Sequence, residues 1–314
     1  YVAPEEFPAK TKFIDRYADV GYNSWGIMQI LGIKPHMQDE LQAILATRFR
    51  RMLKKVVLDF LPPILNEDRY VEMAGPQLKA YKAMQKDMLA ELDGDVITTT
   101  SPLSKATRLL QFASSYAEVI HTPIAGSKGD TSVTTSEVDS DELSIDPEAT
   151  EEDFHTTLKL STPSNKIAAF MEDLKSGDFG DSSLVIFTQS RQLIELLSEK
   201  MTKDGFEHGM ITGAQDSAQR QQAIDDFQSG KLKYVLVTIA AGGVGLTLTA
   251  ADTMVFLQRA YSSTAMTQAK SRAHRIGSEI HESVKIVNYI TRDSIEEAQI
   301  AALEDKAIRI ETIV

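Results

Sequence analysis

The chain has 314 residues, of which 42% are hydrophobic and 25% charged, a composition typical of a globular protein with about two domains. It contains no cysteine, which excludes disulfides and thiolate metal sites, and its six histidines lack metal-ligand spacing, so no metal site is predicted. The net charge of -12 argues at first against nucleic acid as a partner, and the absence of a run of about 18 apolar residues argues against a membrane.

Residues 1–121 are predicted to be mostly helical. Apolar residues recur at helical spacing in the first predicted helix, and Pro62 and Pro63 end that run. Pro76 suits the first turn of the second helix. The predicted helices span residues 41–61, 75–92 and 104–120.

Residues 122–160 are predicted to be an acidic flexible linker or loop. Within this range, residues 122–153 hold ten acids and one base, Lys128, so they contribute -9 of the net charge and leave only -3 for the other residues. A stretch so rich in Ser and Thr and so poor in aromatics buries too little apolar surface to offset its ordering entropy. A basic face elsewhere on the chain is therefore compatible with the total charge. A DNA-mimicking regulatory role for the segment is the alternative interpretation.

Residues 161–314 are predicted to alternate between helices and strands. Repeated strand–helix units predict an α/β fold, a parallel sheet with helices on both faces. In such sheets ligands bind outside the carboxyl ends of the strands. The chemistry is therefore expected in the loops after Gln189, Gly213, Ala240 and Gln258. The predicted strands span residues 183–189, 208–213, 234–240, 252–258 and 284–290, and the predicted helices 164–177, 191–205, 217–230, 264–277 and 294–307.

The string QAKSRAHRIG, residues 268–277, carries the most specific pattern. If the string is helical, Gln268, Arg272 and Arg275 share one face, because residues three or four apart are neighbours on a helix. Two guanidinium groups bind phosphate oxygens bidentately, so the face suits a polyphosphate at the ligand edge of the sheet. An isolated pair of this kind is more often a charged surface helix, so the longer string decides the interpretation.

This string resembles motif VI of the Swi/Snf-type ATPases of helicase superfamily two. The resemblance implies that Arg272 and Arg275 are arginine fingers that reach ATP across a cleft, with Gln268 beside the nucleotide. The string departs from the family pattern at Ser271 and Ser278. It also lacks the Gly-Arg-Thr-Gly-Arg continuation of RNA helicases, which favours the DNA translocase branch.

The string VLVTIAAGGVGLTLTAAD, residues 235–252, resembles motif V of the same family. Glycines allow the backbone to approach a ligand closely. The resemblance implies that Thr238 lies near the DNA backbone and that Gly243 and Gly245 lie near the nucleotide. Thr247 replaces the asparagine that is usual in the family.

Two upstream strings, which contain residues 188–190 and 212–213, resemble the motifs that precede motif V in this family, and they occur in the expected order. Their hydroxyl and amide groups are expected at strand ends, where they can donate hydrogen bonds to DNA phosphates. Residues 13–26, the Leu-Pro-Pro of residues 61–63 and a Q-x-x-x-Y string resemble the segment that joins the two motor lobes of these ATPases, in its annealing-helicase form. The resemblance implies that residues 1–121 form a connector or protrusion region. Arg51 and Lys54 match a basic helix there, which contacts DNA, contacts the partner lobe or is simply solvated. The implied DNA-contact residues upstream are Thr188, Gln189, Ser190, Thr212 and Gly213, and the Q-x-x-x-Y residues are Gln77 and Tyr81.

The resemblance implies a RecA-like second motor lobe of an enzyme that hydrolyses ATP and moves along double-stranded DNA. The sequence contains no G-x-x-x-x-G-K-[ST] string, so ATP and Mg²⁺ are expected to be held mainly by a first RecA-like lobe of the same protein. This chain alone is expected to be inactive. Its location is expected to be intracellular, nuclear in a eukaryote and cytoplasmic in a bacterium or a virus-infected cell. The alternatives are an RNA helicase C-terminal lobe and a non-catalytic interaction module with the same fold.

Overall fold

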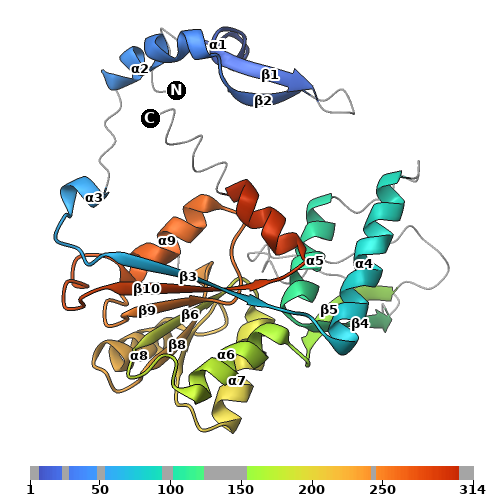
Figure 1. Cartoon of the computed structure of the whole chain (residues 1–314), viewed down its shortest axis with the longest axis vertical. Coiled ribbons are helices and arrows are strands. Elements are labelled where there is room, and N and C mark those ends of the chain that lie inside the picture. Colours follow the sequence, from blue (N-terminus) through green and yellow to red (C-terminus); the bar gives the residue numbers. More distant parts are fainter. Residues whose placement is uncertain are drawn as a thin grey trace, which may run out of the picture. The chain divides into compact units, whose positions relative to one another are not determined.

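The computed structural model describes residues 7–22, 28–47, 54–93, 102–123, 154–241 and 245–303. By its internal packing the chain forms two compact units. One contains Tyr1–Asp59 and Ala301–Val314, and the other contains Phe60–Ile300. Figure 1 labels most of the helices and strands of both units. The division predicted at residues 121 and 160 differs from this one, because residues from Phe60 onward pack with the large unit.

In the first unit, two strands within residues 18–33 form an antiparallel hairpin, inside the region that was predicted to be mostly helical. The two strands of the hairpin pair along their length, for example Val20 with Ile30, so that their backbone groups hydrogen-bond across the strands and their side chains pack together. Arg16 Nη2 and Tyr17 OH both donate to Glu40 Oε1, over 2.6 and 2.8 Å, which ties the first helix to the second. The elements are α1 (Lys10–Tyr17), β1 (Ala18–Tyr22), β2 (Met28–Ile33), η1 (Pro35–Met37), α2 (Gln38–Ala46) and α3 (Lys54–Val57).

The helix predicted over residues 41–61 is described only in part. Helix α2 covers its start and α3 covers residues 54–57, whereas Leu58 and the residues up to Pro63 are not helical. Arg51 lies outside the described residues, and Lys54 is the first residue of α3. The structure therefore does not test whether these two residues share one basic helix.

The second unit is built on a six-stranded sheet with the order β3-β10-β9-β6-β8-β7, in which all neighbouring strands are parallel. The inner strands are apolar and buried, as parallel sheets covered on both faces require. The predicted fold class, a parallel α/β sheet with helices on both faces, is confirmed. The strands are β3 (Ile64–Val71), β6 (Leu184–Thr188), β7 (Gly209–Ile211), β8 (Tyr234–Thr238), β9 (Thr253–Phe256) and β10 (Val284–Thr291).

Alternate strand residues build two hydrophobic cores, one on each face of the sheet. Leu184 and Ile186 of β6 pack in one core, whereas Val185 and Phe187 pack in the other. The period of two along a strand sends successive side chains to opposite faces. Helices α6 (Asn165–Ser176) and α7 (Arg191–Lys203) cover the first face, and α8 (Ser217–Gln228) and α9 (Ser263–Ala273) cover the second.

The helix boundaries follow from side-chain caps. Ser164, Ser190 and Ser262 each accept a backbone N–H of the first turn of the helix that follows. Asp216 forms a reciprocal capping box at the start of α8. Gly177 ends α6 with φ 82°, a conformation that favours glycine.

Strand β3 is an edge strand of the sheet, although the sequence analysis placed its residues in the helical connector. It pairs with β10 along its whole length, from Ile64 with Val284 to Val71 with Thr291. Its Arg69 Nη1 donates to Asp173 Oδ2 of α6 over 2.5 Å. Pairing with β10 and the partly buried ion pair with Asp173 therefore bring β3 into the sheet, although β3 lies more than 200 residues before β10 in the chain.

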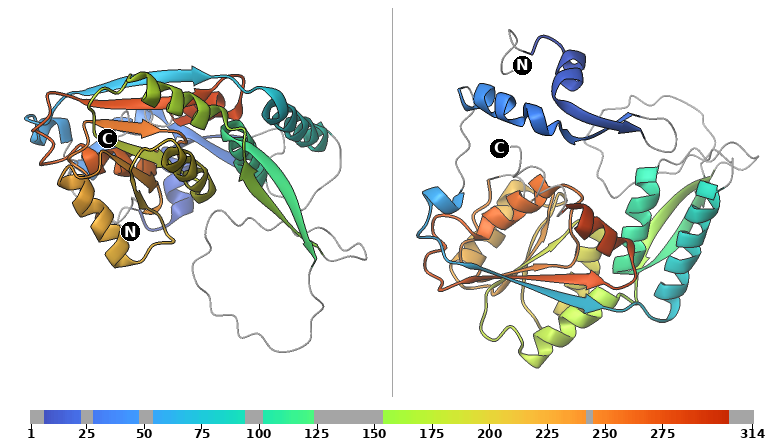
Figure 2. Two further views of the ribbon diagram at one scale, coloured as in Figure 1. Left: turned by 90° about the horizontal axis from the view of Figure 1, so that it is seen from below. Right: turned by 45° about the horizontal axis from the view of Figure 1, so that its top comes forward.

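Helices α4 (Gly75–Asp93) and α5 (Pro102–Ser114) lead into an antiparallel pair, β4 (Tyr116–Pro123) and β5 (Phe154–Ser161). Figure 2 shows this pair in green as a long ribbon. The helix predicted over residues 104–120 ends early, because Tyr116 and the following residues pair with β5. Most of the predicted acidic linker, residues 124–153, lies outside the described residues, and its two ends belong to β4 and β5.

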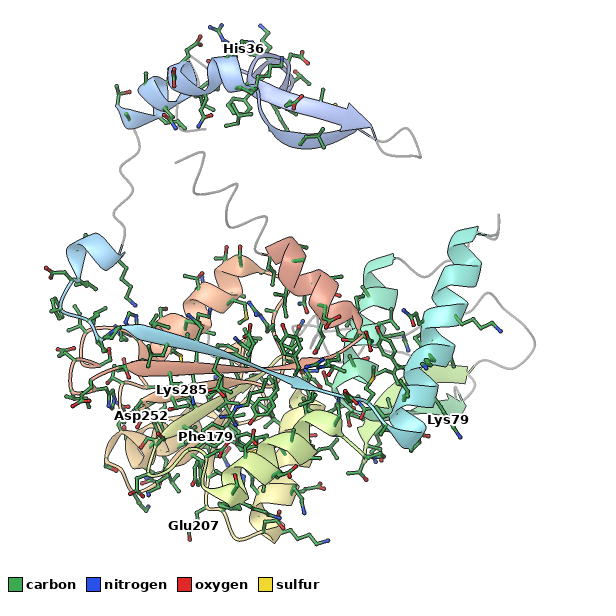
Figure 3. All side chains as sticks on the ribbon, in the orientation of Figure 1. His36, Lys79, Phe179, Glu207, Asp252 and Lys285 are labelled. Carbon is green, nitrogen blue, oxygen red and sulfur yellow. The ribbon has the colours of Figure 1, made fainter. Side chains whose placement is uncertain are left out.

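The predicted site residues lie at two opposite ends of the parallel sheet. Asp252 and Lys285, labelled in Figure 3, mark the starts of β9 and β10, and Lys285 N donates to Asp252 O over 2.8 Å. We call the end where the parallel strands begin the amino edge, and the opposite end the carboxyl edge. Within the described ranges, no helix is both long enough and apolar enough to cross a membrane.

Candidate functional site

The predicted site residues lie at both edges of the sheet. Thr188 ends β6 and Thr238 ends β8, while Thr212 directly follows β7, so all three lie at the carboxyl edge. The last turn of α9 lies at the amino edge, where His274 Nε2 is 2.9 Å from Pro62 O, shortly before β3 begins.

The two arginines of the string at residues 268–277 were expected at the carboxyl edge, and the structure corrects this. Helix α9 follows β9 and precedes β10, and these two strands are parallel. A helix between parallel strands returns the chain to the starting end of the sheet, so its C-terminus comes back to the amino edge. Arg272 and Arg275 therefore lie away from the ends of β6, β7 and β8.

The expectation that both arginines share one helical face is also wrong. Helix α9 ends at Ala273, because His274 leaves the helical region with ψ 86° while its N–H makes the last bond to Lys270 O. Gln268 and Arg272 lie on α9, with Gln268 exposed, but Arg275 belongs to the loop that follows. The contacts of that loop therefore decide where the Arg275 side chain points.

Neutral oxygen atoms hold the guanidinium of Arg275. Its Nη1 donates to Leu246 O over 3.4 Å and to Thr247 Oγ1 over 3.2 Å. Within the part of the chain that the structure describes, no carboxylate forms an ion pair with it. The side chain is partly buried, and its partners among the described residues are neutral oxygens.

The segments around this arginine form what we call the amino-edge junction, residues 245–249 and 272–281. Leu248 N donates to Arg272 O over 2.9 Å, which ties the two segments together. Gly277 has φ 105°, and a Cβ added there would meet Thr249 Oγ1 at 3.3 Å, so the junction requires glycine. Of the predicted nucleotide contacts, Gly245 lies here with φ 55°, whereas Gly243 lies outside the described residues.

The loop after β6 is occupied by its own hydrogen bonds. Thr188 is buried and its hydroxyl donates to Ser190 O over 2.7 Å, while the buried Ser190 hydroxyl accepts from Leu193 N over 3.4 Å. Gln189 is the member of this trio with a partly exposed side chain. Contact of all three with DNA stays a prediction, and for the two hydroxyl groups it requires an exchange of these bonds.

Gln258, which was predicted only as the last residue of a strand, holds this loop in place through its side-chain amide. Its Oε1 accepts from Gln189 N over 3.1 Å and from Ser190 N over 2.8 Å. Its Nε2 donates to Ser114 Oγ of α5 over 3.0 Å. One buried amide therefore satisfies two successive backbone donors and joins the loop to the helical segment.

The other predicted DNA contacts at the carboxyl edge differ in exposure. Thr212 is buried, and both its N–H and its hydroxyl bond to Gln215 Oε1, over 2.6 and 3.0 Å. Gly213 beside it is exposed. Thr238 is buried, and its hydroxyl accepts from Ala241 N over 3.4 Å.

A buried ion pair closes the ends of β9 and β10. Lys166 Nζ donates to Leu257 O over 2.6 Å and to Glu296 Oε1 over 2.5 Å, and Glu296 Oε2 accepts from Thr291 N over 2.8 Å. The two side chains are 1% and 7% exposed, so water does not screen them. Burial lowers the pKa of Lys166, and the Glu296 carboxylate opposes that shift. No sequence pattern pointed to this pair.

Gln77 and Tyr81, the Q-x-x-x-Y residues, connect helix α4 to other elements of the second unit. Gln77 Nε2 donates to Phe112 O and to Asn165 Oδ1, over 3.0 and 2.8 Å, and Gln77 Oε1 accepts from Asn165 N. Tyr81 OH accepts from Ile295 N over 2.8 Å. Both residues are therefore structural connections in this unit.

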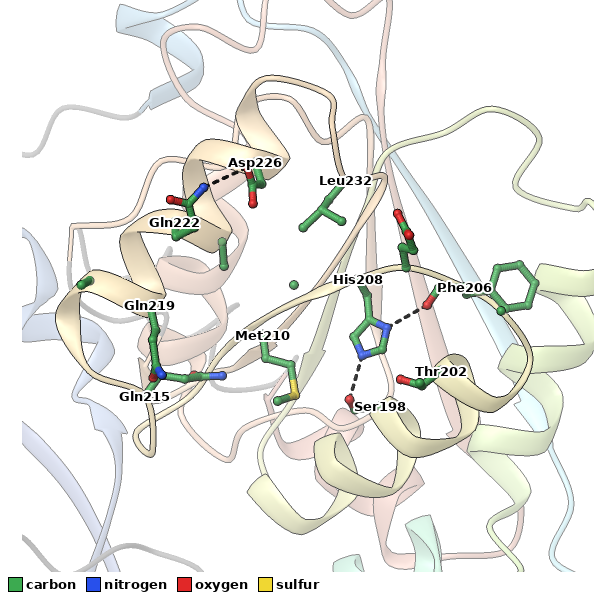
Figure 4. A pocket seen from close by; sticks show the side chains of 15 residues that line it. Ser198, Thr202, Phe206, His208, Met210, Gln215, Gln219, Gln222, Asp226 and Leu232 are labelled. Atoms are coloured by element: carbon green, nitrogen blue, oxygen red, sulfur yellow. Dashed lines mark hydrogen bonds between the residues drawn. The ribbon is translucent and has the colours of Figure 1, made fainter.

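A groove with a volume of about 1200 Å³ runs beside the edge strand β7, between α7 and α8 (Figure 4). His208 lies in it with Nε2 2.7 Å from Ser198 Oγ and Nδ1 2.9 Å from Phe206 O. None of the predicted site residues lines this groove, so it is separate from the amino-edge junction. Among the described residues, no group of three or more His, Asp or Glu side chains is arranged to hold a metal ion.

Residues 165–277 match the family of the helicase conserved C-terminal domain. The chain is 25% identical over 302 residues to the chromodomain-helicase-DNA-binding protein 1-like of Danio rerio, a match covering 95% of this chain and 25% of the relative. It is 32% identical over 140 residues to the chromatin-remodeling ATPase INO80 of Aspergillus oryzae, covering 44% of this chain and 10% of that protein. The chain thus spans a quarter or less of the length of these relatives.

Among solved structures, the C-terminal part of the Fun30 ATPase domain has a similar fold, with a TM-score of 0.54 and 20% identity. That likeness covers 77% of this chain and 89% of the Fun30 chain. The matched residues include α9 and the loop that carries Arg275. Residues 165–277 therefore carry a helicase conserved C-terminal domain, and these likenesses support a RecA-like C-terminal lobe of the Snf2 type.

Proposed function

We propose that this chain is the second motor lobe of an ATP-dependent translocase that acts on double-stranded DNA. Relatives named as a chromatin-remodeling ATPase and as a helicase-DNA-binding protein support ATP hydrolysis and DNA binding by the whole enzyme. ATP and Mg²⁺ are held mainly by a first RecA-like lobe, since this sequence has no phosphate loop. The lobe alone does not turn over ATP. The intracellular location and the annealing-helicase branch stay predictions.

The observation that carries this proposal is the guanidinium of Arg275. It is partly buried and hydrogen-bonded to two neutral oxygens, so its charge remains available to an anion. An arginine that meets the transferring phosphoryl group stabilises the charge that develops in the transition state. We assign this role to Arg275 together with Arg272, and nucleotide contacts to Gln268, Gly243 and Gly245.

The carboxyl edge is proposed to follow the DNA backbone. Contacts to phosphates are largely independent of base sequence, as translocation along duplex DNA requires. Gln189 and Gly213 are the proposed contacts with exposed or partly exposed groups, and Thr188, Ser190, Thr212 and Thr238 would contribute after local rearrangement.

The test is ATP turnover by the intact enzyme, measured with duplex DNA and with RNA. Arg275→Ala is expected to lower DNA-stimulated turnover by roughly 10³-fold or more, the effect of losing an arginine finger. Arg275→Lys keeps the charge but loses the planar fork, so partial activity is expected. Arg292→Ala, which removes an exposed arginine lying over the Tyr70 ring, is the control. Turnover near the wild-type rate in Arg275→Ala would refute the proposal, and stimulation by RNA alone would favour an RNA helicase lobe.

A further inference from the structure

The position of Arg275 outside α9 raises the question of what orients its side chain. A free arginine side chain has about 2 kcal/mol of rotamer entropy, so an unsupported guanidinium would sample many positions. The described hydrogen bonds of this guanidinium go to Leu246 O and Thr247 Oγ1. The first acceptor is a backbone atom that any residue supplies, whereas the second depends on the identity of residue 247.

We propose that Thr247 is the positioning residue for Arg275, holding the guanidinium in the orientation in which it meets the nucleotide. The inference rests on the proposed role of Arg275 as an arginine finger. Thr247 itself is not proposed to touch ATP. It acts through the hydrogen bond from Arg275 Nη1 to its Oγ1.

The amino-edge junction gives the Thr247 hydroxyl a fixed position. Leu248, the next residue, donates its N–H to Arg272 O over 2.9 Å. Thr249 accepts from Gln228 Nε2 at its hydroxyl over 3.1 Å, and its carbonyl lies 2.8 Å from His281 Nε2. A β-branched side chain is also stiff at χ1, so the hydroxyl follows the anchored backbone.

The chemistry of the acceptor suits this role. A carboxylate at residue 247 would form a charge-assisted bond to the guanidinium and neutralise its charge. A hydroxyl orients the guanidinium but leaves its positive charge available to a phosphate. The replacement of the usual asparagine by threonine keeps a neutral oxygen acceptor at this position.

The test compares three substitutions in the intact enzyme. Thr247→Val keeps the β-branched shape of the side chain but removes the hydroxyl. Thr247→Ala removes both the branch and the hydroxyl, whereas Thr247→Ser keeps the hydroxyl and removes only the methyl group. Thr247→Val and Thr247→Ala are each expected to lower kcat roughly 10- to 100-fold, because a small misplacement of a catalytic group has effects of this size. KM for ATP should stay within about twofold, since the contact matters in the transition state. Thr247→Ser should retain kcat within a few fold of the wild type.

A double-mutant cycle separates this inference from the proposed function. In an Arg275→Ala background, Thr247→Val should produce no further loss, because the two residues act as one unit. If Arg275→Ala abolishes turnover but Thr247→Val does not, the positioning role is refuted and the proposed function stands. If Thr247→Ser and Thr247→Val lose the same activity, the hydroxyl is not the cause, and the inference also fails. If Arg275→Ala keeps its turnover, the proposed function falls and this inference falls with it.

Discussion

Three buried polar side chains of the carboxyl edge and Arg275 of the amino edge differ in the partners that hold them. At the carboxyl edge, the hydroxyl of Thr188, the amide of Gln258 and the ammonium of Lys166 are all bonded within the chain. At the amino edge, Arg275 is held by two neutral oxygens and no carboxylate of the described residues neutralises it. Hydrogen-bonded buried groups stabilise one fold, whereas a charge without an ion-pair partner suits the role that we propose for Arg275. Substitutions at the carboxyl edge should therefore reduce stability first, and substitutions at Arg275 should reduce turnover first.

The buried pair of Lys166 and Glu296 should show the largest loss of stability. Lys166→Met leaves the carboxylate buried without its partner, which is expected to lower the free energy of unfolding by about 3–5 kcal/mol. The double variant Lys166→Met with Glu296→Leu removes the unpaired charge and should recover part of that loss. Chemical denaturation of the chain measures both. A loss under about 1 kcal/mol in the single variant, as for an exposed pair, would contradict the network described at this edge.

Gln258 should have the next largest effect. Gln258→Leu leaves the N–H groups of Gln189 and Ser190 without their acceptor, and each buried donor left unsatisfied costs about 1–3 kcal/mol. We expect a total loss of roughly 2–3 kcal/mol, since water entering the loop replaces part of the bonding. Gln189→Ala, which alters the partly exposed side chain of the same loop, is the matched control and should change stability little. Equal stability of the two variants would show that Gln258 does not support the loop.

The smallest expected effect concerns the shape of the amino edge. Gly277→Ala and Gly177→Ala both force alanine into a positive-φ conformation, at φ 105° and 82°, which costs about 1–2 kcal/mol. Only at Gly277 would the new Cβ also meet another side chain, Thr249, whereas at Gly177 nothing lies within 4 Å. Gly277→Ala should therefore be the less stable of the two by a few tenths to about 1 kcal/mol. Thermal and chemical unfolding measure the free energy of unfolding of both variants. Equal losses would show that the Thr249 side chain moves aside at little cost.

Local patterns predicted most of the sheet unit. The apolar run of β6, the cap at Ser164 and the glycine at Gly177 are readable within one or two turns of chain, and the structure places α6 and β6 where these signals indicate. The assignment of Arg272 and Arg275 to a nucleotide site stays a prediction. The predicted geometry of their string was wrong because the pattern of spacing assumed a helix as far as Gly277, whereas α9 ends four residues earlier.

The segment before residue 121 was predicted less well, because its strands depend on partners far away in the sequence. The local sequence around Tyr116 indicates a helix, but in the folded chain Tyr116 pairs with Ser161 as part of a strand. The local sequence around Asp68 indicates a polar connector, but in the folded chain Asp68 lies in β3 and accepts a hydrogen bond from Asn288 of β10 over 2.7 Å.

The sequence by itself determined the α/β class, the order of the strands and helices from residue 161, and the string that carries the two arginines. These features depend on the periodicity and capping of neighbouring residues. Tertiary structure alone decided that β3 completes the sheet, that Gln258 and Lys166 close the carboxyl edge, and that Arg275 meets Thr247 at the opposite edge. These contacts join residues 28 to 220 positions apart. A one-dimensional pattern does not choose such partners, because the choice depends on which groups the folded chain buries together.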